Sequence, residues 1–254
     1  MIKTVVAKRV GLVGDSISTF PFLYFLAKNH RVKVCGEFCP DVIGLLTVNI
    51  DFEIGDTTPE LIMSADHVLE PTLALEYGIK EKLHMWDTHF VYNDFDIESV
   101  QIPHITTNMD FTAPHYNLVV SPFSRSDINN NKKWPDENWI RVLENAKNKS
   151  KLVIGNEKYD NLDLYRPYAD VLGNSSLIHI AGIIHKCGLF ASIENGMGHL
   201  AHLVRKTRHY MLIPPVASPY YYICNRYSKL FVLGPPSSIE WTSVSKDINY
   251  LLEH

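Results

Sequence analysis

Several features are missing from this sequence of 254 residues, and each absence narrows the class of protein. There is neither an apolar run long enough to cross a membrane nor a secretory leader, so we expect a protein that works in solution or at a membrane surface. The four cysteines lack the paired spacing of a zinc site, which favours free thiols in a reducing cytoplasm. Repeats and low-complexity tracts are also absent. The composition is that of an ordinary globular protein.

Basic residues are missing from one long stretch. Residues 36–79 contain nine acidic side chains and neither Lys nor Arg. Acidic loops of this kind are usually solvated surface, and they make a poor platform for a nucleic-acid backbone. The net charge of −4 likewise does not suggest a general binder of polyanions. The basic residues that precede this stretch are Lys3, Lys8, Arg9, Lys28, Arg31 and Lys33.

Apolar runs of strand length alternate with helical runs, a pattern typical of α/β domains. Residues 101–116 contain two prolines and little periodicity, so they are the best candidate for a linker. We therefore predict an N-terminal domain at residues 1–112, a C-terminal domain at 113–238 and a final helix at 239–254 that packs back toward the first domain. Strands are expected at residues 10–13, 32–35, 52–54, 67–69, 117–120, 152–154, 189–193, 210–213 and 230–233. Helices are expected at residues 20–27, 77–89, 175–186 and 237–252.

A glycine-containing turn lies between an apolar run and a helical run at residues 188–206. The turn reads Glu194-Asn195-Gly196-Met197-Gly198, and His199 opens the helical spacing. Backbone N–H groups at such a turn point to one place, and the positive end of the helix dipole favours an anion there. The glycines would let a phosphate approach the backbone closely. The alternative is an ordinary turn, because Gly-x-Gly before a helix often has no ligand.

A second stretch bears on that choice. Residues 117–120 read as a buried strand and lead into Ser121-Pro122-Phe123-Ser124, and after a polar loop Lys132-Lys133-Trp134-Pro135 opens a helix. Together with Asn174-Ser175-Ser176-Leu177 and the glycine turn, in this order and at these separations, the segments resemble the family 9 glycosyltransferases, the lipopolysaccharide heptosyltransferase type. That family has Lys-x-Trp-Pro and Asp-Ser/Thr-Gly-x-x-His-Leu-Ala motifs, so Glu194 stands where the family has Asp. The resemblance covers residues 117–205 well and the N-terminal half thinly.

The resemblance implies a GT-B fold, in which two Rossmann-like domains with parallel sheets face a central cleft. It also implies that a sugar passes from a nucleotide-sugar donor to an acceptor hydroxyl with inversion. The departing nucleoside diphosphate gains negative charge, which a lysine, a hydroxyl and backbone N–H groups would stabilise. His199 would donate to a phosphate oxygen or only pack the helix start. The implied donor-binding residues are Ser124, Lys132, Glu194, Asn195, Gly196, Met197, Gly198 and His199.

Asp15 is the candidate catalytic residue. Gly14-Asp15 follows the first predicted strand, at the edge where parallel α/β sheets bind ligands. The local sequence alone favours a helix N-cap, which needs only an exposed carboxylate. The resemblance instead implies a general base, because the first loop of the family carries Gly-Asp at this place. No Asp-x-Asp motif stands at a strand end, so we expect neither a metal nor a cofactor beyond the donor substrate.

The acceptor and the exact class of function stay open at this level. The resemblance implies a lipopolysaccharide core sugar, whereas compact GT-B enzymes also glycosylate hydroxymethylated pyrimidines in viral DNA, and basic residues flank the proposed base. The expected location is the cytoplasm of a bacterium, or of a host cell for a viral protein. The alternatives are a non-catalytic nucleotide- or carbohydrate-binding module and an unrelated α/β nucleotide enzyme. Glu157 and the cluster Tyr220-Tyr221-Tyr222 are weaker candidates for contacts to a ribose or a base.

Overall fold

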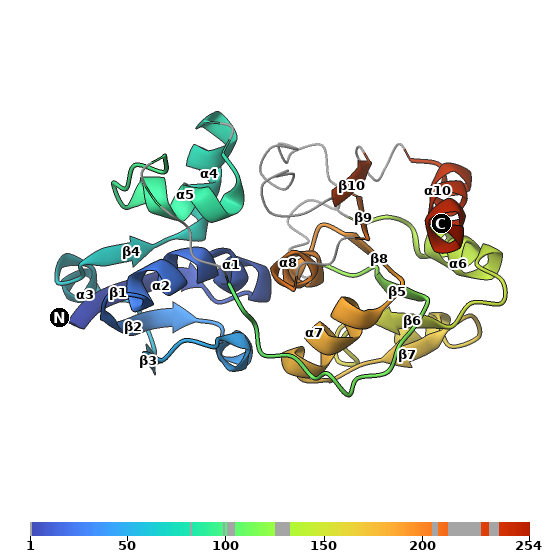
Figure 1. Cartoon of the computed structure of the whole chain (residues 1–254), viewed down its shortest axis with the longest axis horizontal. Helices are drawn as coiled ribbons and strands as arrows, with labels where there is room; N and C mark the ends of the chain where they lie inside the picture. Colours follow the sequence, from blue (N-terminus) through green and yellow to red (C-terminus); the bar gives the residue numbers. More distant parts are fainter. Residues whose placement is uncertain are drawn as a thin grey trace. The chain divides into compact units, whose positions relative to one another are not determined.

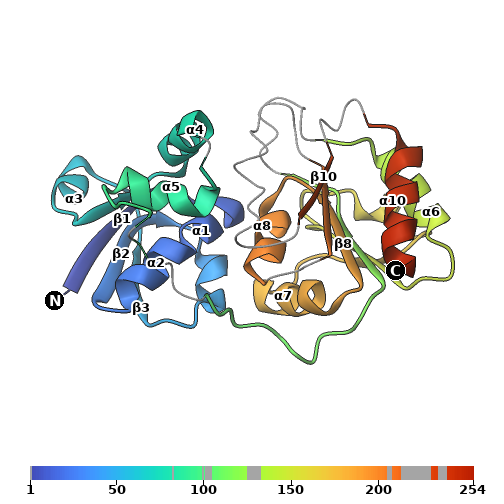
Figure 2. The ribbon, with the colours of Figure 1, turned by 45° about the horizontal axis from the view of Figure 1, so that its top comes forward.

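The chain folds as two compact units that meet between Asn108 and Met109 (Figures 1 and 2). The computed structural model describes residues 2–81, 83–98, 100, 105–124, 133–204, 208–212, 230–233 and 239–254. Lys132 and the tyrosine cluster at 220–222 lie outside the described residues, as does part of the predicted linker.

The first unit is a four-stranded parallel sheet with helices packed against it. Its strands are β1 (Ile2–Val10), β2 (Arg31–Phe38), β3 (Ile50–Ile54) and β4 (His67–Leu69), in the order β3-β2-β1-β4. Its helices are α1 (Val13–Ser18), α2 (Phe20–Ala27), α3 (Pro59–Met63), α4 (Pro71–Glu81) and α5 (Met85–Tyr92), with a 3-10 turn η1 (Pro40–Leu45). The direction of winding changes between β1 and β4. The carboxyl ends of these two strands therefore form the edge at which ligands bind in such sheets.

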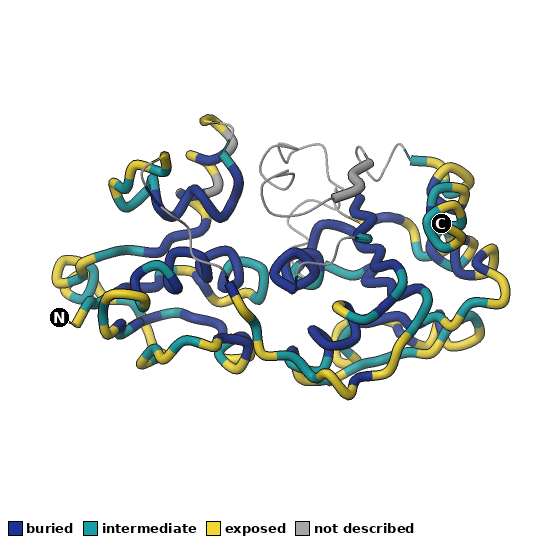
Figure 3. Tube along the Cα trace, in the orientation of Figure 1, coloured by how far each residue is buried: buried dark blue, intermediate teal, exposed yellow. Residues whose placement is uncertain are grey.

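Apolar residues of the first unit are buried where both faces of its sheet are covered. Val5, Val6 and Ala7 of β1 are fully buried, as expected for a central parallel strand. Figure 3 shows buried segments in the middle of this unit and exposed segments at its margin. Phe22 of α2 packs edge-on against Phe90 of α5, with ring centroids 5.3 Å apart. The contact joins α2 to α5 and leaves the loop after β1 at the edge of this core.

Two predicted elements of the first unit differ from the structure. β1 begins at Ile2 instead of residue 10, and it ends at Val10. The helix predicted over residues 77–89 is two helices, because the Nδ1 of His84 accepts a hydrogen bond from the Trp86 N–H at 3.2 Å and caps a separate α5. Both differences depend on contacts that the local apolar pattern does not encode.

The second unit is a six-stranded parallel sheet. Its strands are β5 (Leu118–Ser121), β6 (Lys151–Ile154), β7 (Asp170–Leu172), β8 (Leu189–Ile193), β9 (His209–Leu212) and β10 (Leu230–Leu233), in the order β10-β9-β8-β5-β6-β7. Its helices are α6 (Asp136–Asn145), α7 (Leu177–Lys186), α8 (Gly196–Leu203) and α10 (Trp241–Glu253), with a 3-10 turn η2 (Leu162–Leu164). The winding changes between β5 and β8, so the second ligand-binding edge lies there.

The final helix α10 is part of the second unit. It packs beside α6 (Figure 2), and Val244 and Ile248 join a core that includes Trp134 and Trp139. The indole N–H of Trp134 donates to the Ile239 carbonyl at 3.1 Å, which ties the start of α6 to the segment before α10. The expected approach of this helix to the first domain stays a prediction. In the described ranges, no helix is both long and apolar enough to cross a membrane.

Candidate functional site

Asn195 joins the two loops at the carboxyl edge between β5 and β8. Its side-chain N–H₂ group donates to the Ser121 carbonyl at 3.1 Å, the Ser121 hydroxyl at 3.0 Å and the Phe123 carbonyl at 2.8 Å. Its Oδ1 accepts from the Gly198 N–H at 2.8 Å and caps α8. The residue is 7% exposed, so these bonds form away from bulk water. Asn195 therefore fixes the glycine turn against the loop after β5.

The start of α8 keeps the features of an anion site. Its first turn contains no acidic residue, and its cap is a neutral amide. Gly198 gives its N–H to Asn195, whereas no group among the described residues accepts from the N–H of Gly196 or Met197. Both residues are partly exposed. An incoming phosphate would thus meet two backbone donors and the positive end of the helix dipole.

Gly198 serves helix packing. A Cβ at this position would lie 2.7 Å from the Met211 Cε and 3.3 Å from the Ser192 Oγ. The glycine therefore lets α8 lie directly on β8 and β9, and the close approach of a ligand is not needed to explain it. The backbone N–H groups for which no described residue is an acceptor are therefore those of Gly196 and Met197, which precede Gly198.

Glu194 and His199 form a buried pair next to the turn. The His199 Nε2 lies 3.2 Å from the Glu194 Oε1, and the two residues are 8% and 4% exposed. Glu194, which precedes the N-cap, thus reaches the histidine in the first turn of α8. If Nε2 donates to this carboxylate, His199 can donate to a phosphate from Nδ1 only in its protonated form.

More histidines lie behind this turn. The His209 Nε2 lies 3.0 Å from the Ser192 Oγ, and burial together with the nearby His199 lowers the pKa of His202 to about 3. His202 is therefore neutral at ordinary pH. Across the described residues, no three His, Cys, Asp or Glu side chains are placed to hold a metal ion.

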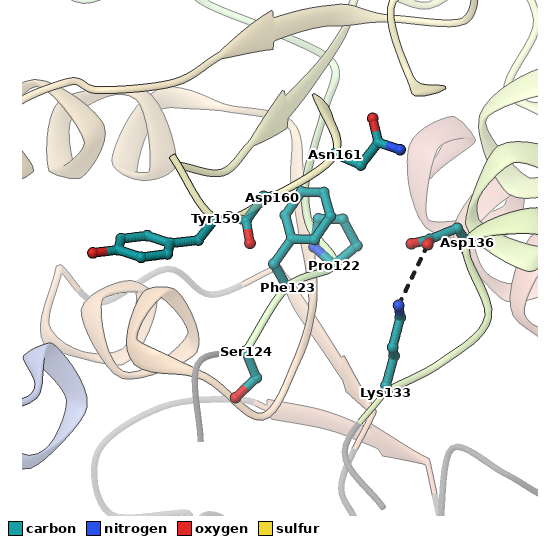
Figure 4. A pocket seen from close by; sticks show the side chains of 8 residues that line it. All are labelled: Pro122, Phe123, Ser124, Lys133, Asp136, Tyr159, Asp160 and Asn161. Carbon is teal, nitrogen blue, oxygen red and sulfur yellow. Dashed lines mark ion pairs between the residues drawn. The ribbon is translucent and has the colours of Figure 1, made fainter. Parts of the chain in front are cut away.

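A pocket of about 220 Å³ adjoins the same loop. Phe123 lies in its wall, as Figure 4 shows, and the carbonyl of Phe123 is the one that accepts from Asn195. The pocket and the glycine turn are therefore connected through a single residue. The lining residues are Pro122, Phe123, Ser124, Lys133, Asp136, Tyr159, Asp160 and Asn161.

The lining of the pocket suits a neutral ring better than a phosphate. It includes two carboxylates and one ammonium, and the Lys133 Nζ lies 3.6 Å from the Asp136 Oδ2. The Tyr165 hydroxyl donates to the Asp136 Oδ1 at 2.7 Å and holds this carboxylate in place. Phe123 and Tyr159 supply aromatic walls. Of the predicted donor residues, the half-buried Ser124 lines this pocket, whereas no local sequence pattern points to Tyr159 or Asn161.

Asp15 lies in the first turn of α1 in the first unit. The N-cap of α1 is Leu12, and Asp15 is the third helical residue, so the hypothesis that Asp15 is the cap is wrong. Ser16 anchors the loop, because its hydroxyl donates to the Val10 carbonyl at 2.7 Å and accepts from the Cys39 N–H at 3.2 Å. Asp15 is half-buried at the carboxyl end of β1. Its position opposite Gly196 across a cleft stays a prediction.

A buried histidine supports α1 from behind. The His89 Nε2 of α5 lies 3.0 Å from the Ser18 hydroxyl. Complete burial lowers the pKa of His89 to about 4, so the ring is neutral at ordinary pH. The sequence pattern did not single out this contact.

Most of the basic residues that precede the acidic stretch are paired with carboxylates from that stretch. Lys8 lies 3.0 Å from the Glu70 carboxylate, and Arg9 approaches the same carboxylate at 3.9 Å. Lys33 lies 2.5 Å from the Glu53 carboxylate, and this contact lowers the pKa of Glu53. The same pairing joins Lys3 to Asp66 at 2.9 Å and Arg31 to Asp51 at 2.8 Å. In the folded first unit, therefore, five of the six basic residues that precede the acidic stretch form ion pairs with carboxylates.

The sequence matches no protein-family model and no curated protein. Several solved structures resemble the whole chain, and three of them are family 9 enzymes or heptosyltransferases. A family 9 glycosyl transferase from Veillonella parvula DSM 2008 has a TM-score of 0.70 at 14% identity, with 99% of this chain and 97% of that chain covered. Escherichia coli ADP-heptose lipopolysaccharide heptosyltransferase II has a TM-score of 0.68 at 14% identity, with 99% and 98% covered. E. coli heptosyltransferase WaaC with ADP has a TM-score of 0.66 at 12% identity, with 99% and 100% covered. The predicted fold is therefore confirmed: the chain has two Rossmann-like parallel sheets in the GT-B fold of the heptosyltransferases.

Proposed function

We propose that the protein is an inverting glycosyltransferase that uses a nucleotide-sugar donor. The observation that carries this proposal is the α8 turn, where Asn195 holds two partly exposed backbone donors at the start of a helix without acidic residues. This arrangement suits a diphosphate group. The likeness to heptosyltransferases supports the same ligand class, because two of them are named with ADP or ADP-heptose.

The donor would extend from the turn into the adjoining pocket. Its diphosphate would meet Gly196 and Met197, and its base would enter between Phe123 and Tyr159. The nearby carboxylates accept hydrogen bonds, so they favour a base with an amino group, such as adenine. Lys132 would add a point charge for the phosphates, as the resemblance implies.

The chemistry follows from the charges that change during transfer. Asp15 would accept the proton of the acceptor hydroxyl while the hydroxyl oxygen bonds to the anomeric carbon. The bond from this carbon to the diphosphate oxygen would break on the opposite face, so the configuration inverts. The negative charge that appears on the leaving diphosphate would be stabilised by the N–H groups of Gly196 and Met197. We further propose that neither a metal nor a cofactor takes part and that the reaction occurs in the cytoplasm.

The first unit supports a saccharide acceptor over DNA. A duplex is held through several unmatched Lys or Arg side chains along its phosphates. Here five of the six basic residues that precede the acidic stretch lie close to carboxylates, with Lys8 and Arg9 sharing Glu70, and these carboxylates offset most of their charge. We therefore propose a sugar hydroxyl as the acceptor.

Calorimetric titration with ADP and UDP, followed by a transfer assay with ADP-heptose, tests the proposal. We expect ADP to bind more tightly than UDP, and transfer to continue in the presence of a chelator. Donor binding without transfer to any saccharide would favour the alternative, a non-catalytic nucleotide-binding module on the same fold. If neither nucleotide binds, the donor site is wrong.

The pocket has a sharper test. Tyr159→Ala should weaken ADP binding by about ten-fold, since stacking of a base on an aromatic ring is worth about 1–3 kcal/mol. Tyr159 is 59% exposed, so the substitution should leave the fold intact. Tyr250→Ala is the matched control, because Tyr250 is 60% exposed on α10. Equal affinities of the two variants would exclude Tyr159 from the base site.

A further inference from the structure

The short helix that carries Asp15 needs support from outside itself. α1 has 6 residues, one of which is Gly14, and its N-cap Leu12 makes no side-chain hydrogen bond. An isolated helix of this length is not stable, because forming its first turn costs more than so few residues return. Asp15 is half-buried, whereas the residues from Ser16 to Ser18 are buried. The contacts of these buried residues therefore decide how the backbone at Asp15 is held.

The Ser18 hydroxyl joins the backbone of Asp15 to α5. Its oxygen donates to the Asp15 carbonyl at 2.6 Å and lies 3.0 Å from the His89 Nε2. A serine hydroxyl has one hydrogen, so a hydroxyl that donates to the carbonyl can only accept from the histidine. Burial lowers the pKa of His89, which keeps the ring neutral with a single N–H group. The ring proton of His89 is therefore on Nε2, which donates to Ser18.

The other ring nitrogen of His89 gains nothing from its surroundings. In this tautomer Nδ1 is an acceptor, and no donor reaches it from any residue that the structure describes. A buried acceptor without a partner costs free energy, which an apolar side chain of similar size would avoid. Packing alone thus favours an apolar residue at this fully buried position. What the histidine adds is the N–H group that faces Ser18.

Asn93, at the end of α5, fixes this helix to the sheet. Its Oδ1 accepts from the Val68 N–H at 2.9 Å, and its N–H₂ group donates to the carbonyls of Val68 and His89 at 2.9 and 2.8 Å. Val68 belongs to β4 and pairs with Val6 of β1, the strand that leads into α1. The hydrogen bonds and the chain therefore form a closed path inside the first unit, from β1 through α1 and α5 to β4 and back.

We propose that His89 is a positioning residue for Asp15, which it holds through the Ser18 hydroxyl, and that Asn93 holds His89 in turn. An imidazole N–H that is fixed in direction leaves the Ser18 hydrogen free only for the Asp15 carbonyl. Without that N–H, the Ser18 side chain can rotate, and the backbone at Asp15 loses its anchor. The effect on turnover rests on the proposed function, whereas the hold on the helix does not.

His89→Leu and His89→Gln form the main test. Leucine fills the space without an N–H, whereas glutamine can place an amide N–H near the position of Nε2. Hydrogen exchange at the α1 amides should accelerate about ten-fold in His89→Leu and stay close to the parent rate in His89→Gln. The kcat of His89→Leu should fall by about ten- to a hundred-fold, because misplacement of a reacting group costs this much, and His89→Gln should recover most of it. ADP affinity should stay at the parent value in both variants.

Thr88→Val is the matched control. Thr88 is fully buried on the same helix, and its hydroxyl donates to the Met85 carbonyl at 2.7 Å, inside α5. The substitution removes a buried hydrogen bond from α5 but none that reaches α1, so α1 exchange and kcat should match the parent. If Thr88→Val accelerates α1 exchange as much as His89→Leu does, His89 contributes only general stability and the proposal is wrong.

Ser18→Ala tests the route of this support and replaces His89→Leu if that variant does not fold. Because His89 acts through Ser18, the double variant should exchange no faster at α1 than the faster single variant, and multiplied effects would overturn the proposal. In the parent, NMR of the ¹⁵N-labelled histidine rings should show the His89 proton on Nε2; a proton on Nδ1 would also overturn it. If α1 exchange accelerates as expected but the parent transfers no sugar, the hold on the helix stands and the proposed function fails.

Discussion

The helices α1 and α8 both begin at the edge of a parallel sheet where the winding changes, yet their first turns carry opposite charge patterns. The first turn of α1 contains Asp15, and its N-cap Leu12 offers no side-chain hydrogen bond. The first turn of α8 has no acid, and its N-cap Asn195 makes four hydrogen bonds. A helix that carries its own carboxylate balances its dipole internally, whereas one without an acid can bind an external anion. In the function proposed above, the same local motif would present a proton acceptor in one unit and backbone N–H donors for a phosphate in the other.

The largest expected effect follows from removing the charge of the first turn. Asp15→Asn keeps the shape of the side chain but cannot accept the proton, so turnover should fall by about 10² to 10⁴ while ADP affinity holds. The measurement is transfer to the true acceptor, because slow hydrolysis of the donor is not an adequate substitute. Asp41→Asn in η1 is the control, since it removes an exposed first-turn acid of the same unit. Near-parental turnover of Asp15→Asn would remove the mechanism.

The second prediction compares how the stability of the two units depends on pH, because each unit contains a buried histidine. The pKa of His89 is lowered from 6.5 to about 4, so between these values the unfolded chain binds a proton that the folded first unit does not. This difference in proton binding leaves the free energy of unfolding unchanged above pH 6.5 and lowers it as the pH falls toward 4, by on the order of 3 kcal/mol in all. His202 should act likewise in the second unit down to about pH 3. Urea unfolding at pH 7 and pH 4.5 measures the change in the free energy of unfolding between these pH values. This change should be smaller for His89→Gln than for the parent. An equal change in both proteins would show that His89 does not cause the loss of stability in acid.

The third prediction concerns a substitution that gives the start of α8 a carboxylate, as the first turn of α1 has. Asn195→Asp keeps an oxygen for the Gly198 N–H but places a negative charge at the start of α8 and removes the donors to Ser121 and Phe123. ADP affinity should fall by about ten- to a hundred-fold, since a hydrogen bond to a charged group is worth about 1.5–3 kcal/mol. Asn195→Ser also loses the amide N–H₂ group but keeps a neutral cap, so the comparison of the two variants isolates the effect of the negative charge. If Asn195→Asp binds ADP as well as Asn195→Ser does, the turn is not the phosphate site.

The smallest effect concerns the lysine that the resemblance assigns to the donor. Lys132→Ala should weaken ADP binding by roughly ten-fold, because in the proposed role it removes one hydrogen bond to a charged phosphate. Lys147→Ala, at an exposed position after α6, controls for the loss of one positive charge from the unit. Calorimetry that shows the same affinity for both variants would leave Lys132 as a surface residue.

Elements with a strong local pattern could be predicted from the sequence. The bounds of α2, β4, β8 and β10 agree with the predicted runs, and Pro21 lies in the first turn of α2, where its missing N–H is not needed. The first eight residues of β1 were missed because lysines interrupt their apolar pattern. Lys3 and Lys8 reach Asp66 and Glu70, far along the chain, so only the folded sheet shows why they are tolerated.

The site followed the same rule. The glycine turn and Asp15 could be named as candidates from the sequence, because each is a contiguous motif that also resembles a known family, and their roles stay predictions. The bridge from Asn195 to the loop after β5 could not, because its partners lie more than seventy residues away. The contact between Glu194 and His199 could not be predicted either, because the two side chains come within reach only when α8 has formed. The proposed base pocket combines the connection from β5 to α6 with the connection from β6 to β7, and it has no sequence signature.

The tryptophan pair near the start of α6 gives the protein an optical reporter of its own. Trp134 and Trp139 are fully buried, with ring centroids 4.9 Å apart and ring planes at 88°. Two indoles held so closely should produce a near-ultraviolet circular dichroism band that disappears when their packing is lost. Trp86, the tryptophan of the first unit, is not part of the pair. Loss of this band would therefore time the unfolding of the second unit separately from the first, without any attached label.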